Sequence, residues 1–171
     1  VESYAVAWEE VLRPLVARQT PGVTVLRDYH AENIMLLGGK AGAPQGLIDF
    51  QDALVGHPAY DLVSLLQDAR RDVPVDLETS MLVHYAHHAG IANDDFLADY
   101  ATLGAQRNAK IVGIFTRLDR RDGKPKYLGM IPRVWAALER DLAHPALAPV
   151  ADWFDANIPD VLRNANGAFP A

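Results

Sequence analysis

Three side chains suited to metal binding and acid–base chemistry lie close together in the first third of the chain. Asp28 and Asn33 are five residues apart, and Asp49 follows sixteen residues after Asn33. In phosphoryl transfer, one carboxylate orients the attacking hydroxyl and accepts its proton, while an amide oxygen and a second carboxylate hold Mg²⁺. Mg²⁺ keeps several of its waters, so two protein ligands suffice. These residue types are therefore a set that phosphoryl transfer can use.

The segments around these residues predict how they would be brought together. Residues 23–26 are a β-branched run typical of a strand. Residues 33–37 and 46–50 are apolar runs joined by a Gly- and Pro-containing connector, which predicts a β-hairpin. Because Asn33 begins this hairpin and Asp49 lies near its end, we expect the two side chains to be neighbours. An Asp and an Asn in one loop are also common in ordinary turns. The functional interpretation of Asp28 and Asn33 therefore depends on the hairpin that follows them.

The remainder of the chain has the apolar spacing of helices. We predict helices over residues 2–19, 59–68, 76–89, 94–121, 131 or 133 to 142, and 148–157. Pro14 is expected to break or kink the first of them. The fold class that results is mainly α with a small β-hairpin (α+β), in a single domain over residues 1–171. Within it, residues 23–50 form the loop and hairpin, and residues 59–157 form a helical subdomain.

Composition excludes several functional classes. The 171 residues carry 16 basic and 22 acidic side chains, for a net charge of −6, which argues against a partner such as nucleic acid or an anionic membrane surface. The absence of cysteine excludes disulfides, Cys-ligated zinc and thiol catalysis. No apolar run has the length of a membrane helix, and no secretory signal is recognisable. A cytoplasmic enzyme or binding domain is expected.

Three segments resemble a known superfamily. Residues 26–33 read L-R-D-Y-H-A-E-N, which matches the protein-kinase pattern H-R-D-x-x-x-x-N except at its first position. They are closer still to the H-G-D-x-H-x-x-N loop of the aminoglycoside phosphotransferase and choline kinase superfamily. Residues 47–50 (L-I-D-F) and 58–62 (P-A-Y-D-L) resemble the segments that follow in that superfamily. Residues 49–53, 60–65, 104–108 and 121–125 are similar to the bacterial anomeric kinases of N-acetylmuramate and N-acetylglucosamine.

The resemblance implies a role for each motif residue. Asp28 would be the catalytic base, and Asn33 and Asp49 would bind Mg²⁺ and, through it, ATP. Asp61 would be structural and would accept backbone hydrogen bonds from the catalytic loop. His30 would brace that loop or approach the phosphate of the nucleotide.

The resemblance also implies that the chain is the C-terminal lobe of a protein-kinase-like fold. The chain has no G-x-G-x-x-G loop, and its four lysines lie in the hairpin connector or downstream of residue 109. The phosphate-covering N-terminal lobe of the same protein is therefore expected to precede Val1, and the isolated piece is expected to be inactive. Leu26 stands where the superfamily usually has His, and Gln51 stands where a protein kinase has the Gly of D-F-G.

Three interpretations of the activity follow. The first is phosphorylation of an amino-sugar hydroxyl, as in the anomeric kinases. The second is phosphorylation of an aminoglycoside or another small alcohol. The third is a catalytically inactive, pseudokinase-like interaction module. Leu26 in place of the usual His and the absence of the N-terminal lobe motivate this interpretation.

Other polar residues allow both a functional and a structural interpretation. Gln106, Arg107 and Asn108 interrupt an otherwise apolar helix, where they would either line a sugar pocket or form hydrogen bonds within a packed core. His84 and His88 share a helix face, but surface histidines are favoured over a metal site. The basic residues from 117 to 126 are favoured as a solvated helix end, with contact to a negatively charged sugar as the alternative.

Overall fold

The computed structural model describes residues 1–18, 21–39, 42–91 and 94–163. The described chain is mainly helical, with two small antiparallel sheets, and this confirms the predicted α+β composition. In chain order the elements are α1 (Glu2–Arg18), β1 (Val23–Val25), β2 (Ile34–Leu36), β3 (Gln45–Leu47), β4 (Leu54–Gly56), α2 (Ala59–Leu66), α3 (Val75–Ala89), α4 (Asp94–Asp122), α5 (Ile131–Leu142), α6 (Ala148–Asn157) and α7 (Asp160–Arg163). Short 3₁₀ turns cover Ala31–Asn33, Pro125–Met130 and Pro145–Leu147.

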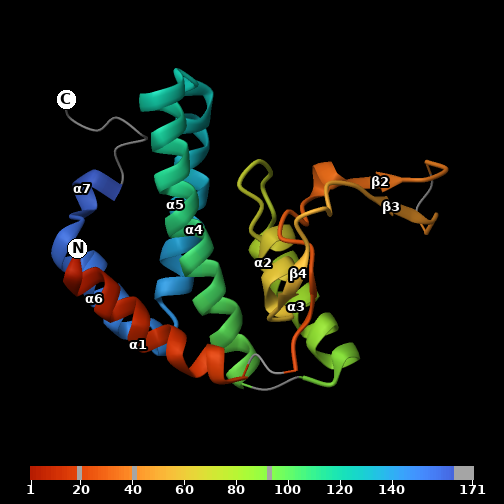
Figure 1. Ribbon diagram of the computed structural model, residues 1–171, viewed down its shortest axis with the longest axis horizontal. Helices are drawn as coiled ribbons and strands as arrows, with labels where there is room; N and C mark the ends of the chain where they lie inside the picture. Colours follow the sequence, from red (N-terminus) through yellow and green to blue (C-terminus); the bar gives the residue numbers. More distant parts are fainter. Residues whose placement is uncertain (19–20, 40–41, 92–93, 164–171) are drawn as a thin grey trace.

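The long helix α4 is the axis of the molecule. It packs along α5 through the centre, with α1 and α6 on one side and α2, α3 and the strands on the other (Figure 1). Ala101 and Ala105 of α4 meet α1, α5 and α6, whereas Phe96 and Leu103 meet α2 and α3. Farther along, Ile111 and Phe115 pack against the start of α5. Burial on several sides explains why apolar residues recur along this helix at short intervals.

The prediction of a break at Pro14 is wrong, because α1 is assigned as one helix from Glu2 to Arg18. Pro14 is exposed, while Val11 and Leu15 on either side of it are buried. The proline therefore lies on the solvent side of the helix, and both halves pack into the interior through the buried face. That packing outweighs the loss of one backbone hydrogen bond.

The strands form two separate pairs. Strands β2 and β3 pair in the expected hairpin, with Ile34 opposite Leu47. The sequence did not predict the other pair, in which Val23 of β1 lies opposite Gly56 of β4. Because β1 and β4 pair, the segment between them begins and ends at the same place in the structure. The loop that follows β1 therefore lies beside the start of α2.

Candidate active site

The loop between β1 and β2 and the end of the hairpin both carry strained backbone. Among the described residues, the non-glycine positions with positive φ are Arg27, at 72°, and Asp49, at 60°. Each such position costs on the order of 1–3 kcal/mol and persists only where surrounding contacts fix it. The strained positions are therefore Asp49, which is a predicted site residue, and Arg27, which directly precedes the predicted site residue Asp28.

Asp61, in the first turn of α2, fixes the strained loop. Its Oδ2 accepts a hydrogen bond of 2.7 Å from the Leu26 N–H, and its Oδ1 accepts one of 3.0 Å from the Arg27 N–H. A carboxylate that accepts two backbone N–H groups makes charge-assisted hydrogen bonds, which are stronger than neutral ones. Asp61 thus holds the two residues that precede Asp28 in place.

The hairpin brings Asn33 and Asp49 together at its base. The Asn33 Nδ2 lies 3.4 Å from the Asp49 Oδ2 and donates a 2.9 Å hydrogen bond to the Asp28 carbonyl. The Ile48 N–H donates to the Asn33 carbonyl at 3.1 Å, which extends the β2–β3 ladder to this point. Asp28, Asn33 and Asp49, separate in the sequence, are therefore neighbours in the structure.

The donor set at this point suits Mg²⁺ better than a transition metal. Asn33 and Asp49 offer an amide and a carboxylate at an exposed edge, and Mg²⁺ favours oxygen ligands together with waters and phosphate. In the described part of the chain, no three His, Cys, Asp or Glu side chains are grouped as a metal site. The residues present therefore fit a two-ligand Mg²⁺ site, with Gln51 Nε2 donating to the other Asp49 oxygen at 2.7 Å.

His30 is placed to brace the loop. Its side chain is only 7% exposed, and its Nε2 lies 3.4 Å from the Asn33 Nδ2. Burial, assisted by the charge of Arg70, lowers the pKa of His30 below its ordinary value, so the imidazole is neutral at pH 7. A neutral ring beside Asn33 favours the bracing role over contact with a phosphate.

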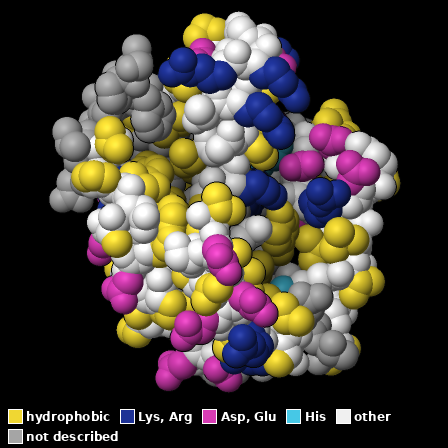
Figure 2. Space-filling view, turned by 60° about the vertical axis from the view of Figure 1, so that its left-hand side comes forward, with side chains coloured by type: hydrophobic (Ala, Val, Ile, Leu, Met, Phe, Trp, Pro, Cys, Tyr) yellow, Lys and Arg dark blue, Asp and Glu magenta, His cyan; other side chains and the backbone are white. Residues whose placement is uncertain are grey.

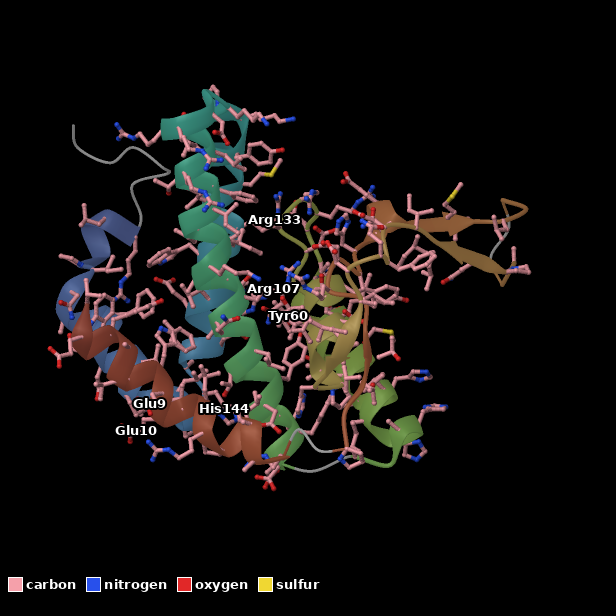
Figure 3. The ribbon with its side chains drawn as sticks, in the orientation of Figure 1. Glu9, Glu10, Tyr60, Arg107, Arg133 and His144 are labelled. Carbon is pink, nitrogen blue, oxygen red and sulfur yellow. The ribbon has the colours of Figure 1, made fainter. Side chains whose placement is uncertain are left out.

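A pocket opens beside Asp28 on the side of α4. Residues that line it include Arg27, Asp28, Tyr60, Arg70, Arg107 and Lys110. Figure 3 shows Arg107 reaching from α4 toward Tyr60 of α2. Asn33 and Asp49 are not among its lining residues, so Asp28 adjoins both the Asn33–Asp49 pair and a separate cavity. That arrangement suits a base that serves an acceptor on one side and a phosphate on the other.

Comparison with known proteins identifies the family. Residues 2–103 match the family model described as the phosphotransferase enzyme family (APH). The chain belongs to this phosphotransferase family.

Several curated relatives are named N-acetylmuramate/N-acetylglucosamine kinase. The one from Caulobacter vibrioides is 46% identical over 156 residues, which is 89% of this chain and 43% of the relative. The one from Neisseria meningitidis is 41% identical over 139 residues (77% and 40%), and the one from Pseudomonas aeruginosa is 39% identical over 155 residues (85% and 45%). The matched part of the chain thus spans less than half the length of each of these relatives.

The three polar residues of α4 have different surroundings in the structure. Arg107 lines the pocket beside Asp28, whereas Gln106 is partly buried and lies outside that pocket's lining. Asn108 is 0% exposed, and its Nδ2 donates to the Gln67 Oε1 at 2.7 Å and to the Asp141 Oδ2 at 3.3 Å. For Asn108 the geometry favours hydrogen bonding within the core over contact with a sugar.

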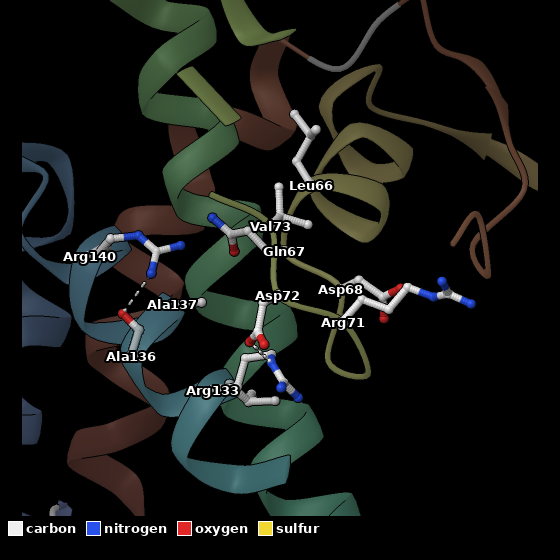
Figure 4. A pocket seen from close by; sticks show the side chains of 11 residues that line it. Leu66, Gln67, Asp68, Arg71, Asp72, Val73, Arg133, Ala136, Ala137 and Arg140 are labelled. Atoms are coloured by element: carbon white, nitrogen blue, oxygen red, sulfur yellow. Dashed lines mark hydrogen bonds and ion pairs between the residues drawn. The ribbon is translucent and has the colours of Figure 1, made fainter. Parts of the chain in front are cut away.

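The remaining candidates lie away from the pocket. His84 and His88 are exposed on α3, with ring centroids 4.1 Å apart. Exposed basic residues gather where α4 ends and the following turn begins, and Figure 2 shows this charge near one end of the molecule. A further pocket lies between α5 and the connection from α2 to α3, with the Arg133–Asp72 ion pair on its wall (Figure 4). None of these features lines the cavity beside Asp28.

Several contacts that hold the site were not predicted. The Ser64 Oγ accepts a 2.8 Å hydrogen bond from the Arg107 Nη2 and lies 3.5 Å from the Arg27 carbonyl. The His57 Nε2 lies 3.1 Å from the buried Asp99 of α4. The buried Asp99 is 42 positions from His57, and no local pattern marks such a partner.

Within the described residues, no helix combines the length and the apolar character that crossing a membrane requires.

Proposed function

We propose that this chain is the C-terminal lobe of an ATP- and Mg²⁺-dependent kinase that phosphorylates a hydroxyl of an amino sugar. The observation that carries the proposal is the position of Asp28. It adjoins the paired Asn33 and Asp49, whose side chains are 3.4 Å apart, and lines a pocket that also contains four basic side chains. Membership of the phosphotransferase family and the names of the curated relatives support the same reaction.

In the proposed reaction, the acceptor hydroxyl enters the pocket beside Asp28. Its oxygen attacks the γ-phosphorus of ATP, the bond from that phosphorus to the β-γ bridging oxygen breaks, and ADP leaves. The Asp28 carboxylate orients the hydroxyl and accepts its proton. Asn33 and Asp49 would hold Mg²⁺, which supplies charge neutralisation for the phosphates when it is bound. Asp61 and His30 keep the loop in the conformation that presents Asp28.

Half of the nucleotide site would come from elsewhere in the protein. Beside the metal-binding edge, Met35, Leu36, Ile48 and Phe50 expose between 48% and 65% of their surface. An apolar area of this kind suits a surface that a nucleotide base and a further lobe cover in the complete protein. The relatives are more than twice as long as the part matched here, which leaves room for such a lobe. Dependence on ATP suits a cytoplasmic enzyme.

The charge of the pocket favours an amino sugar over an aminoglycoside. Arg27, Arg70, Arg107 and Lys110 line it, and Asp28 is its one acidic lining residue. Aminoglycosides are polycations, which these side chains would repel. The inactive-module alternative is disfavoured because Asp28, Asn33 and Asp49 are all retained and assembled.

A substrate panel tests the proposal. The full-length protein is incubated with ATP and Mg²⁺ and either N-acetylmuramate, N-acetylglucosamine or an aminoglycoside, and the phosphorylated product is followed by ³¹P NMR. We expect transfer to an amino sugar, loss of transfer with EDTA, and no transfer to the aminoglycoside. Binding of Mg²⁺–ATP without transfer to any acceptor would contradict the proposal and favour an interaction module.

A further inference from the structure

The pocket beside Asp28 has an excess of positive charge in a chain of net charge −6. Four of its lining residues are basic (Arg27, Arg70, Arg107 and Lys110), and one is acidic. The one lining carboxylate, that of Asp28, is the proposed base and has to face the acceptor. A local excess of cations in an acidic protein indicates a ligand of opposite charge.

Arg107 is the buried member of this group. It is 7% exposed, and its Nη2 donates a 2.8 Å hydrogen bond to the Ser64 Oγ. Its Nη1 is buried and has no hydrogen-bond partner among the described residues. Because a buried charge without a partner is costly and Arg107 is one of the residues that line the cavity, its guanidinium is suited to pairing with an anion that enters the cavity.

The nearby carboxylates offset only part of the group's charge. Asp68 is buried close to Arg107 and acts on its charge, but its Oδ1 accepts a hydrogen bond from the Arg70 N–H, and it lines the neighbouring pocket rather than this one. Glu32 is 3.5 Å from the Arg70 Nε, and both side chains are at least one-third exposed, so this pair contributes little. Lys110 Nζ donates to the Tyr60 hydroxyl at 3.3 Å, which leaves its charge uncompensated by that contact.

The position of the basic residues indicates which of the two reactants, acceptor or nucleotide, they would contact. Arg107 and Lys110 project from α4, and neither Asn33 nor Asp49 lines this cavity. Asp28 lines this cavity and the proposed Mg²⁺ ligands do not, so the cavity is separate from the proposed metal-binding edge. An anion held here would belong to the molecule that provides the hydroxyl.

We propose that this cavity binds a carboxylate of the acceptor and that Arg107 selects a carboxylated amino sugar over a neutral one. The inference rests on the proposed function and specifies its substrate. N-Acetylmuramate and N-acetylglucosamine share the anomeric hydroxyl and the acetamido group, and only the first carries a lactyl carboxylate. Arg107 would form a charge-assisted hydrogen bond with that carboxylate, and Lys110 and Arg70 would add to the local positive potential.

The test compares kcat/KM for the two sugars in the full-length protein, as wild type and as Arg107→Gln. Arg107 also contacts Ser64, so turnover of both sugars can fall, but any shared loss cancels in the ratio of the two kcat/KM values. We expect the wild type to prefer N-acetylmuramate and the variant to lose about ten- to a hundredfold of that preference. The methyl ester of N-acetylmuramate, which lacks the charge, should not be preferred by either protein.

Ser64→Ala is the matched control. It removes the 2.8 Å partner of Arg107 but leaves the guanidinium charge in place, so it should lower kcat/KM for both sugars by the same factor. An unchanged sugar ratio in Arg107→Gln would overturn the inference and give Arg107 a structural role or one at the transferred phosphate. The proposed function would then stand, provided that both sugars are still phosphorylated.

Isothermal titration calorimetry with N-acetylmuramate alone separates the two proposals. Binding that is lost in Arg107→Gln, in a protein that phosphorylates neither sugar, would support the carboxylate site and overturn the kinase assignment. Absence of both binding and turnover in the wild type would overturn both.

Discussion

Two groups of polar side chains in this protein have opposite environments. Asp28 and Asp49, at the loop and the base of the hairpin, are exposed and adjoin backbone with positive φ. Asn108 and Asp141, between α4 and α5, are buried, and the Gln67 amide joins them. An exposed group can exchange its present contacts for a metal, a phosphate or a substrate, whereas a buried group specifies how helices pack. Polar residues in an apolar context therefore do not by themselves mark a functional site.

The buried group is a connected network. Gln67 Nε2 donates to the Glu78 Oε1 at 3.0 Å and to the Asp141 Oδ1 at 2.8 Å, and the Tyr100 hydroxyl donates to the same Glu78 oxygen at 2.8 Å. Arg140 pairs with the other Glu78 oxygen at 3.0 Å. Burial raises the pKa of Asp141 to about 7. This network therefore links the end of α2 with α3, α4 and α5. One of its members, Asp141, gains or loses its proton near neutral pH.

The largest contrast between the two groups is expected from Asp49→Ala. Loss of a proposed Mg²⁺ ligand should lower kcat in the full-length protein by about 10³-fold, because charge stabilisation of the transferred phosphate is lost. The melting temperature should change little, since Asp49 is exposed. Steady-state kinetics and thermal unfolding of the same preparation measure both. A large fall in melting temperature with normal kcat would reverse the roles assigned to the two groups.

Asp141 should give the folded protein a stability that falls as pH rises. Its pKa is higher in the folded than in the unfolded state, so between about pH 4 and pH 7 the folded state holds the extra proton. The free energy of unfolding should therefore decrease by about 2–3 kcal/mol between pH 5 and pH 8 through this group. Denaturant unfolding of wild type and Asp141→Asn at both pH values isolates the effect. Equal pH slopes in the two proteins would exclude it.

A smaller effect is expected where α4 and α5 approach each other. A Cβ added at Gly104 would lie 2.5 Å from the Asp141 Oδ2, so Gly104→Ala should destabilise the protein by about 1–3 kcal/mol. Gly113→Ala, on the same helix with nothing within 4 Å of the added Cβ, should instead stabilise it by about 0.5–1 kcal/mol. Chemical denaturation compares the two, and the same sign for both would contradict the packing described here.

Local patterns predicted the parts of the site that are local. The hairpin followed from two apolar runs around a turn-rich connector, and its pairing places Asn33 beside Asp49. Strand β4 was not predicted, because three residues give too short a pattern and its partner β1 is about thirty positions away.

The environments of the polar residues of α4 could not be predicted from the sequence. Arg107 and Asn108 are adjacent in an apolar helix, and both interpretations, pocket and core, suited them equally. The structure separates them because a helix turns by about 100° per residue. Arg107 thus lines the pocket together with Asp28 and donates to Ser64, whereas Asn108 faces Gln67 and Asp141. Their partners come from other helices, and the residue types alone do not reveal which partner each one has.

Single-turnover kinetics of Asp28→Asn in the full-length protein test whether Asp28 is the base of a phosphoryl transfer. Asn keeps the shape of the side chain and cannot accept the proton, so the rate of the chemical step should fall by about 10²–10⁴-fold. Mg²⁺–ATP binding and thermal stability should stay near the wild-type values. Asp152→Asn, which changes an exposed carboxylate on α6, should leave the rate unchanged. A wild-type rate in Asp28→Asn would contradict the account.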